Sequence, residues 1–226
     1  LPFAGQFARL AEYLMPDREE GELAVSAAVI GWTELHLDPS MLVVPAMALG
    51  QARGEIRRMA FAVRHMLTEI MPAFTHNDTE VIDNILERDS QVDYLEDRIS
   101  DYLVSISRAG LNQHQADENV RLMNATKDLE HLGDLIERNM VDLLRKKAES
   151  AIHFSDEGRE ELFNYHRRVL ENYDRAIDAF DREDADLAHA VIQTKADLVE
   201  LEWNYRKTHY NRLSRGLSES IESSQI

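Results

Sequence analysis

Proline and glycine are scarce in this chain, and their scarcity limits the folds it can adopt. The sequence has 5 Pro and 9 Gly in 226 residues, and no proline follows Pro72. Sandwiches and barrels need a turn about every 8–12 residues, and such turns depend on these two residue types. The composition therefore favours long helices over a β architecture.

Apolar residues from Pro45 onward recur at spacings of three and four, which is the period of an amphipathic helix. We expect one helix from Pro45 to Met71-Pro72, a second from an Asn77 N-cap to about Gly110, and a third from an Asn112 N-cap to about Lys147. Their apolar seams are Ile56, Met59, Val63, Met66, Leu67 and Ile70; Ile85, Val92, Leu95, Ile99, Tyr102 and Ile106; and Leu122, Leu129, Leu132, Ile136 and Leu143. Three long helices with short connections predict an antiparallel bundle.

The remaining sequence repeats the first part at an offset of 106 residues without a gap. The offset pairs Glu55 with Glu161, Val63 with Val169, Phe74 with Phe180, Asp78 with Asp184, Glu96 with Glu202 and Gly110 with Gly216. This register predicts a duplicated bundle, all-α throughout. The third helix of the second copy would extend past Ile226, so the second bundle lacks its last helix in this chain and has an apolar face to be covered.

These patterns predict three segments along the chain. Residues 1–44 are a linker, with a short helix expected over 6–14 and a strand possible within 23–35. Residues 45–148 form the first bundle, and residues 149–226 form the second, truncated one. Because the chain begins with Leu1 rather than Met, we expect it to be part of a longer protein.

Charge and composition narrow the possible partners. The formal net charge of −17 opposes binding to nucleic acid or to an anionic membrane surface, and it favours cations or basic partners. No apolar run reaches the roughly 18 residues of a membrane span, and no signal peptide is present. The absence of cysteine excludes disulfides and thiolate metal sites.

Two acidic pairs are the candidate site. Asp89 and Asp93 lie on the expected second helix, and Glu130 and Asp134 lie on the third, with Gly133 beside them. A spacing of four places both carboxylates of a pair on one helix face, roughly 6 Å apart, where like charges disfavour the helix. Both pairs fall on the flanks of the apolar seams, so a shared site would be a shallow groove open to water. Clustered carboxylates suit a hard divalent cation such as Mg²⁺, Mn²⁺, Ca²⁺ or iron.

Two other interpretations of these residues stay open. The pairs are also typical of solvated acidic faces in an acidic protein, which would bind no metal. Asp128 with His131, and Asp186 with His189, have a spacing found in di-iron carboxylate bundles, although those sites use Glu facing inward. No phosphate loop, nucleophile elbow or other catalytic motif is present, and no small-molecule site is evident.

The motifs Asp89-Ser-Gln-Val-Asp93 and Leu129-Glu130-His-Leu-Gly133-Asp134 resemble the two E/D-x-x-x-D motifs of the PhoU-like family of phosphate-uptake regulators. The segments LPFAGQFARL and LDPSMLVVPAMALGQARGEIRRM are similar to the junction that follows the membrane domain of bacterial sodium/phosphate cotransporters. The resemblance implies duplicated three-helix bundles and surface metal clusters. Arg138 stands where the family often has Asn, and Lys195 and Val199 replace the second copy of the first pair, so a second cluster is not expected.

The resemblance therefore implies a non-catalytic regulatory domain of a sodium-dependent phosphate transporter, at the cytoplasmic face of the inner membrane. The expected cofactor is one divalent metal ion (Mg²⁺, Mn²⁺, iron or Zn²⁺) held by Asp89, Asp93, Glu130 and Asp134. The expected partners are its own or a partner transmembrane domain, and a second copy of the chain. The alternatives are a free-standing PhoU-type regulator, a metal-free helical scaffold and, last, a di-iron carboxylate enzyme.

Overall fold

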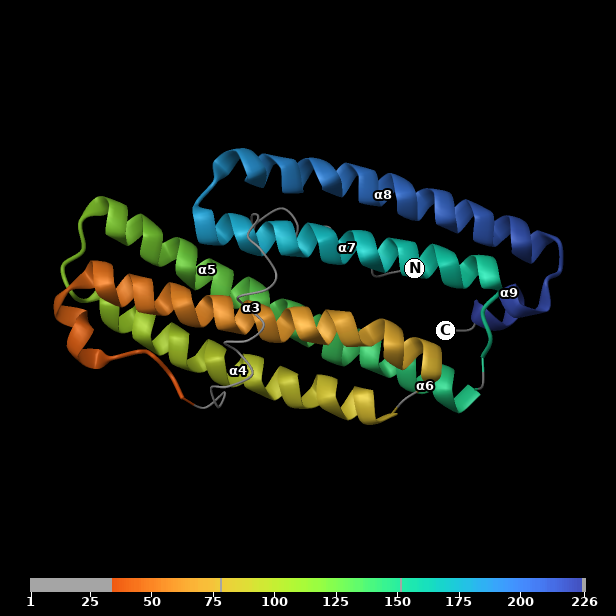
Figure 1. The fold of residues 1–226 in the computed structure, drawn as a ribbon, viewed down its shortest axis with the longest axis horizontal. Coiled ribbons are helices and arrows are strands. Elements are labelled where there is room, and N and C mark those ends of the chain that lie inside the picture. Colours follow the sequence, from red (N-terminus) through yellow and green to blue (C-terminus); the bar gives the residue numbers. More distant parts are fainter. Residues whose placement is uncertain (1–33, 78, 151, 225–226) are drawn as a thin grey trace. The chain divides into compact units, whose positions relative to one another are not determined.

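A computed structural model describes residues 34–77, 79–150 and 152–224 of the chain (Figure 1). These residues contain helices and connecting segments and no β-strand, which confirms the predicted all-α class. The elements in chain order are the 3₁₀-helix η1 (Pro39–Val43), α3 (Pro45–His76), α4 (Thr79–Ser107), α5 (Gln113–Leu135), the π-helix η2 (Ile136–Val141), α6 (Asp142–Ser150), α7 (Asp156–Arg182), α8 (Ala185–Ser214) and α9 (Ser218–Ser223). The helix expected over 6–14 and the possible strand within 23–35 lie outside the described residues, apart from the last two positions of the latter.

The described residues pack into two compact units. One contains residues 34–66 and 84–136, and the other contains residues 67–83 and 137–224. The boundary falls inside α3 and α4, so both helices contribute to both units. The division at residue 148 follows the sequence repeat, which is a different criterion, and it stays a prediction.

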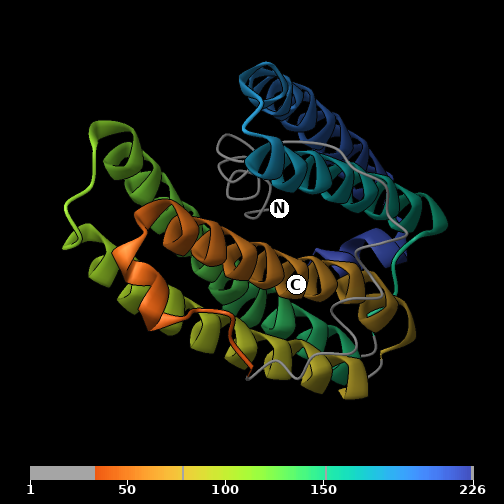
Figure 2. The ribbon, with the colours of Figure 1, turned by 60° about the vertical axis from the view of Figure 1, so that its left-hand side comes forward.

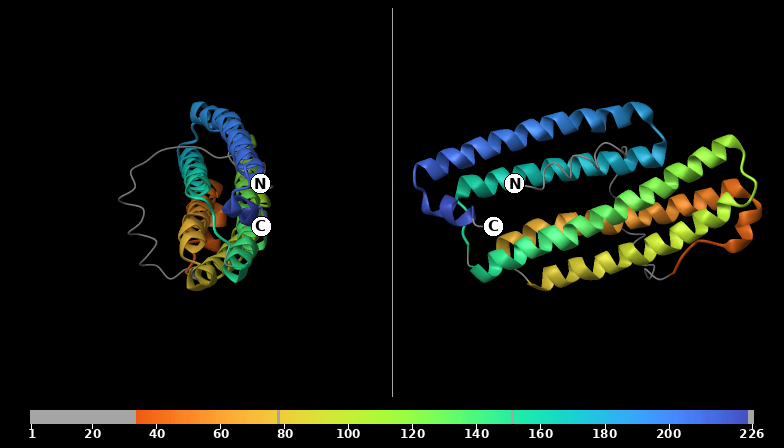
Figure 3. Two further views of the ribbon diagram at one scale, coloured as in Figure 1. Left: turned by 90° about the vertical axis from the view of Figure 1, so that its right-hand side faces the viewer. Right: turned by 180° about the vertical axis from the view of Figure 1, so that it is seen from behind.

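In the first of these units α3, α4 and α5 lie side by side in an up–down–up order (Figure 2). The predicted seams of α3 and α4 are fully confirmed, because every one of their side chains is buried. Polar contacts join the helices at the edges of this core: Arg53 Nη2 of α3 lies 2.7 Å from Glu118 Oε1 of α5. In the other unit α7 and α8 form an antiparallel hairpin (Figure 3).

The predicted helix ends are right at Pro45, where α3 begins, and at Asn112, and they are wrong at Asn77 and Pro72. Asn112 caps α5 through a full capping box with Gln115, as expected. Asn77 does not cap α4; it adopts a left-handed φ of 53° and ends α3 instead. Pro72 does not end α3 either, and the helix continues to His76. A proline removes only one backbone donor, and so near a C-terminus the helix can continue for one more turn.

The backbone itself carries the predicted repeat. Four described residues have positive φ, and they form two pairs at the offset of 106: Asn77 (53°) with Glu183 (52°), and Gly110 (71°) with Gly216 (71°). The first pair ends α3 and α7, and the second turns the chain after α4 and α8. Since positive φ is uncommon outside glycine, these matches support a real duplication. By the same offset α9 corresponds to the first turn of α5.

A π-helical turn interrupts the third helix, which the sequence analysis did not predict. η2 occupies Ile136–Val141, directly after α5. A π-turn closes on residue i+5 rather than i+4, so it adds about one residue to the helical register. As a result Val141 and Leu144 are buried, whereas Leu143, assigned to the seam, is only half-buried.

None of the helices in the described ranges combines the length and the apolar character that crossing a lipid bilayer requires.

Candidate functional site

Asp89 and Gly133 bring α4 and α5 into close contact at the candidate site. A Cβ atom at position 133 would lie 2.9 Å from Asp89 Oδ1 and 3.3 Å from Val92 Cγ1. Glycine therefore stands inside α5 because the side chains of α4 occupy the space of any larger residue. Asp89 is only 7% exposed, so its expected position on an open flank is wrong. Asp89 is covered because α4 and α5 approach each other closely at Gly133.

The two acidic pairs do lie on adjoining faces of α4 and α5. Burial raises the pKa of Glu130, and the neighbouring negative charge of Asp134 raises it further. Glu96 and Asp93 of α4 add to this effect across the helix interface, and Lys127 opposes it. Negative charge from both helices is thus concentrated around one carboxyl group.

Lys127 of α5 supplies positive charge to this group of carboxylates around Glu130. Its Nζ lies 2.6 Å from Glu96 Oε1, so it bridges α5 to α4. The hydrogen bond to Glu96 raises the pKa of Lys127, with the charges of Glu96, Glu130 and Asp97 contributing. Ser100 Oγ also donates to Glu96 Oε1, at 2.7 Å.

Glu96 is the residue that the sequence analysis left out of the site. It is 8% exposed and sits between the two helices with its charge compensated by Lys127. Its signal was its position: Glu96 follows Asp93 by three residues, so it shares the face of α4 that carries the first pair.

The cluster is not a formed coordination sphere. Within residues 34–77, 79–150 and 152–224, no three His, Asp or Glu side chains are grouped closely enough to share a metal ion. The donor chemistry, all carboxylate oxygen, fits a hard divalent cation. Binding would require side-chain rotations, most readily of Asp93, which is exposed, and of the partly exposed Glu130 and Asp134.

The alternative di-iron pairs do not face inward together. His131, Asp186 and His189 are exposed. Asp128 is half-buried, and burial raises its pKa while His131 lowers it. A di-iron site needs its carboxylates and imidazoles inside the bundle, so these two pairs lack the required placement.

Comparison with known families and proteins supports the expected class. Residues 56–143 match the PhoU domain, a stretch that contains both acidic pairs but covers less than half of the chain. The whole chain is also similar to proteins named "Putative inorganic phosphate export protein YjbB". It is 25% identical to the one from Salmonella typhimurium strain LT2 and 24% identical to those from Escherichia coli K12 and Shigella flexneri, over 226 residues in each case.

These alignments include all of this chain but only 40% of each relative. The chain therefore spans about two fifths of the length of the curated relatives it matches. No solved structure matched the chain.

Proposed function

We propose that this chain is a non-catalytic regulatory domain of a protein that moves inorganic phosphate across the inner membrane, and that it acts at the cytoplasmic face. The observation that carries the proposal is the PhoU match over residues 56–143, within a chain that aligns end to end with proteins named for phosphate export. The resemblance to sodium/phosphate cotransporters adds sodium dependence to the proposal. The direction of transport follows the relatives, so we propose export rather than uptake.

Phosphate flux in cells tests this role. Cells that express the full-length gene product would be loaded with radiolabelled phosphate, and efflux would be measured at several internal phosphate levels. The same measurement would follow deletion of the region corresponding to residues 45–224. We expect the deletion to remove the dependence of efflux on internal phosphate. Efflux with unchanged rate and unchanged dependence would contradict the proposal.

We also propose that Asp89, Asp93, Glu130 and Asp134 bind one divalent cation across α4 and α5, which would fix how these helices pack. The support is the concentration of carboxylates around Glu130. A bound cation would compensate their repulsion, as Lys127 already does for Glu96. The competing interpretation is a metal-free scaffold in which Lys127 supplies enough positive charge by itself.

Thermal unfolding separates the two interpretations. Mn²⁺ or Mg²⁺ would be added at constant ionic strength, because a ligand that binds only the folded state at about 100 times its Kd stabilises it by about 2.7 kcal/mol. We expect a rise in Tm for the parent that is lost in Asp93→Asn/Glu130→Gln. The matched control is Asp83→Asn/Glu87→Gln on the exposed part of α4, which makes the same change in charge. No rise in any of the three proteins would support the scaffold, and an equal rise in all three would mean that the cation binds outside Asp93 and Glu130.

A further inference from the structure

An extended chain segment lies against α3 and α4, the first two helices of the first sequence repeat. Residues 34–38, which we call the strap, precede η1 and lie along α3. The backbone N–H of His36 donates to Glu55 Oε1 at 3.0 Å, and the His36 ring nitrogen Nδ1 lies 3.0 Å from the same oxygen. Arg58 Nη1 donates to the backbone carbonyl of Glu34 at 2.5 Å and to Glu55 Oε2 at 2.9 Å.

The other end of the strap is held in the same way. The backbone N–H of Asp38 donates to Gln51 Oε1 at 3.2 Å. The Tyr102 hydroxyl of α4 lies 2.8 Å from both the Asp38 carbonyl oxygen and Gln51 Oε1. Side chains of α3 and α4 therefore hold the strap largely through its main chain, an arrangement that suits an extended peptide of varied sequence.

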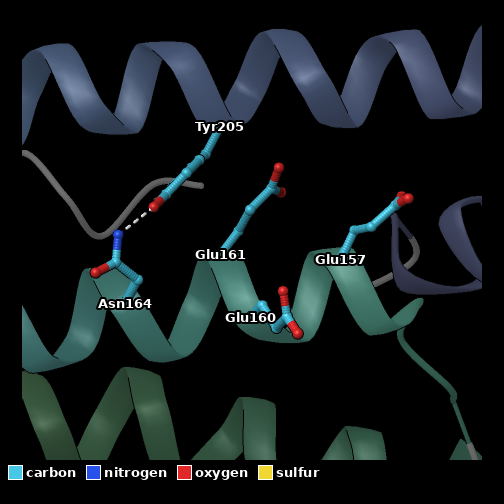
Figure 4. Close-up of a pocket in the computed structure, with 5 residues that line it drawn as sticks. All are labelled: Glu157, Glu160, Glu161, Asn164 and Tyr205. Atoms are coloured by element: carbon cyan, nitrogen blue, oxygen red, sulfur yellow. Dashed lines mark hydrogen bonds between the residues drawn. The ribbon is translucent and has the colours of Figure 1, made fainter.

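The second repeat has a pocket at the corresponding place. A pocket of about 330 Å³ lies between α7 and α8, lined by Glu157, Glu160, Glu161, Asn164 and Tyr205 (Figure 4). By the offset of 106, the four α7 residues correspond to Gln51, Gly54, Glu55 and Arg58 of α3, three of which hold the strap. The positions that would supply a strap, 140–144, are helical in η2 and α6. The described chain thus has no extended segment at that register to fill the pocket.

The residues that line the pocket differ in charge from the corresponding residues of α3. Glu157 replaces Gln51, Glu160 replaces Gly54, and Asn164 replaces Arg58, so each exchange lowers the local charge by one. Arg212 in place of Ile106 returns one positive charge, so the second site is more negative than the first by two charges and suits a more positive occupant than the strap. Glu157 and Glu160 are both exposed. The charge of Glu157 helps to raise the pKa of Arg212, but within the described part of the chain neither glutamate lies within ion-pair distance of a cationic side chain.

Glu161, the counterpart of Glu55, does not need a cation from outside. Arg212 of α8 donates to both of its carboxylate oxygens, at 3.0 and 2.6 Å, and Thr208 Oγ1 donates at 2.5 Å. Arg212 replaces the buried Ile106 of the first repeat, so the second repeat carries its own substitute for the strap's interaction with the glutamate.

We propose that the α7–α8 pocket binds an extended, basic peptide segment of a partner protein. Its backbone would lie along α7 as the strap lies along α3, and Lys or Arg side chains would pair with Glu157 and Glu160. This interaction is independent of the phosphate-related role and of metal binding, so it can fail while both of those stand.

Two synthetic peptides test the proposal with the whole chain. The first has the sequence of residues 34–44 with Glu34→Lys and Asp38→Lys, and the second has that sequence unchanged. Calorimetry would compare their binding to the parent and to Glu157→Gln/Glu160→Gln. We expect the lysine peptide to bind the parent more tightly than the acidic one. We expect the variant to weaken it about fivefold, as the loss of two partly exposed ion pairs implies.

A control variant distinguishes binding in this pocket from general attraction to an acidic protein. Asp197→Asn/Glu200→Gln removes the same charge from exposed positions of α8. We expect this variant to bind the lysine peptide as the parent does. Equal weakening in both variants, or no preference of the parent for the lysine peptide, would overturn the proposal. Circular dichroism would confirm that both variants keep the helical content of the parent.

Discussion

Gly133 illustrates how one residue can be unfavourable for a helix and favourable for the contact between two helices. A glycine inside a helix costs about 1 kcal/mol relative to alanine. At position 133 this cost is offset because Asp89 and Val92 of α4 occupy the space that a Cβ would fill. Gly54 of α3 has the same intrinsic cost, but apart from its chain neighbours and its own helix backbone no atom of the described residues lies within 4 Å of its Cβ position.

This difference predicts opposite effects of the same substitution. Gly54→Ala should raise the free energy of unfolding by about 0.5–1 kcal/mol, through helix propensity alone. Gly133→Ala should lower it by about 1–2 kcal/mol, because the new methyl group displaces buried side chains. Urea unfolding of both variants and the parent checks the prediction. A stabilised Gly133→Ala protein would show that α4 and α5 do not approach closely at this residue.

His166 of α7 is a second residue whose properties depend on its surroundings, because burial changes the pKa of its imidazole. Its Nε2 lies 2.7 Å from the backbone carbonyl oxygen of Leu67, so this nitrogen donates the hydrogen bond. Burial lowers the pKa of His166 below its usual 6.5, although the hydrogen bond to Leu67 opposes this. The folded chain thus binds a proton at His166 less readily than the unfolded chain.

The sign of the resulting pH dependence follows from proton counting. Below pH 6.5 the unfolded chain binds a proton at His166 before the folded chain does, so stability falls as pH falls, by at most about 1.4 kcal/mol per pH unit. Urea unfolding at pH 7.5 and pH 5.5 should show a smaller loss for His166→Gln than for the parent. His114→Gln, at an exposed position, should behave as the parent does. Identical losses in all three proteins would exclude His166 as the source.

At the scale of the helix, the π-turn η2 changes which side chains face the interior. The predicted seam continued from Ile136 to Leu143 at the α-helical period. The observed buried positions are Ile136, Val141, Leu144 and Lys147, a spacing that contains one additional residue. Lys147 therefore points inward, where its Nζ lies 2.6 Å from Asn77 Oδ1 and 4.8 Å from the centre of the Phe74 ring. Burial lowers the pKa of Lys147.

The ends of α3 and α7 predict another pair of opposite effects. Glu183→Gly should raise the free energy of unfolding by about 0.5–1 kcal/mol, because glycine adopts a left-handed conformation without strain. Asn77→Gly gains less relief, because asparagine tolerates this conformation, and it removes the hydrogen-bond acceptor of the buried Lys147 ammonium, which costs about 1–3 kcal/mol. Thermal unfolding should show a higher Tm for the first variant and a lower one for the second. A rise in both would mean that Asn77 contributes little to holding Lys147.

At the scale of the whole molecule, the sequence allowed prediction of the features to which many residues contribute. It did not allow prediction of those that depend on a single contact between helices. Hydrophobic period and the offset of 106 predicted the helices, their buried seams and the duplication, because many residues contribute to each signal. The same period placed the acidic pairs on the flanks of the seams, and a site shared between the two helices was a hypothesis. The partner of Lys127, the burial of Asp89 and the register of η2 each depend on one contact between helices, and such a contact leaves no periodic trace in the sequence.

The matched backbone angles at Asn77 and Glu183, and at Gly110 and Gly216, have a practical consequence. Because the main chain turns in the same manner at both members of each pair, every position between them has a counterpart at the same place in the other half, and the side chains at the two positions can be compared directly. Each half can therefore serve as the internal reference for the other, and exchanging single residues between them asks what each half has come to do differently.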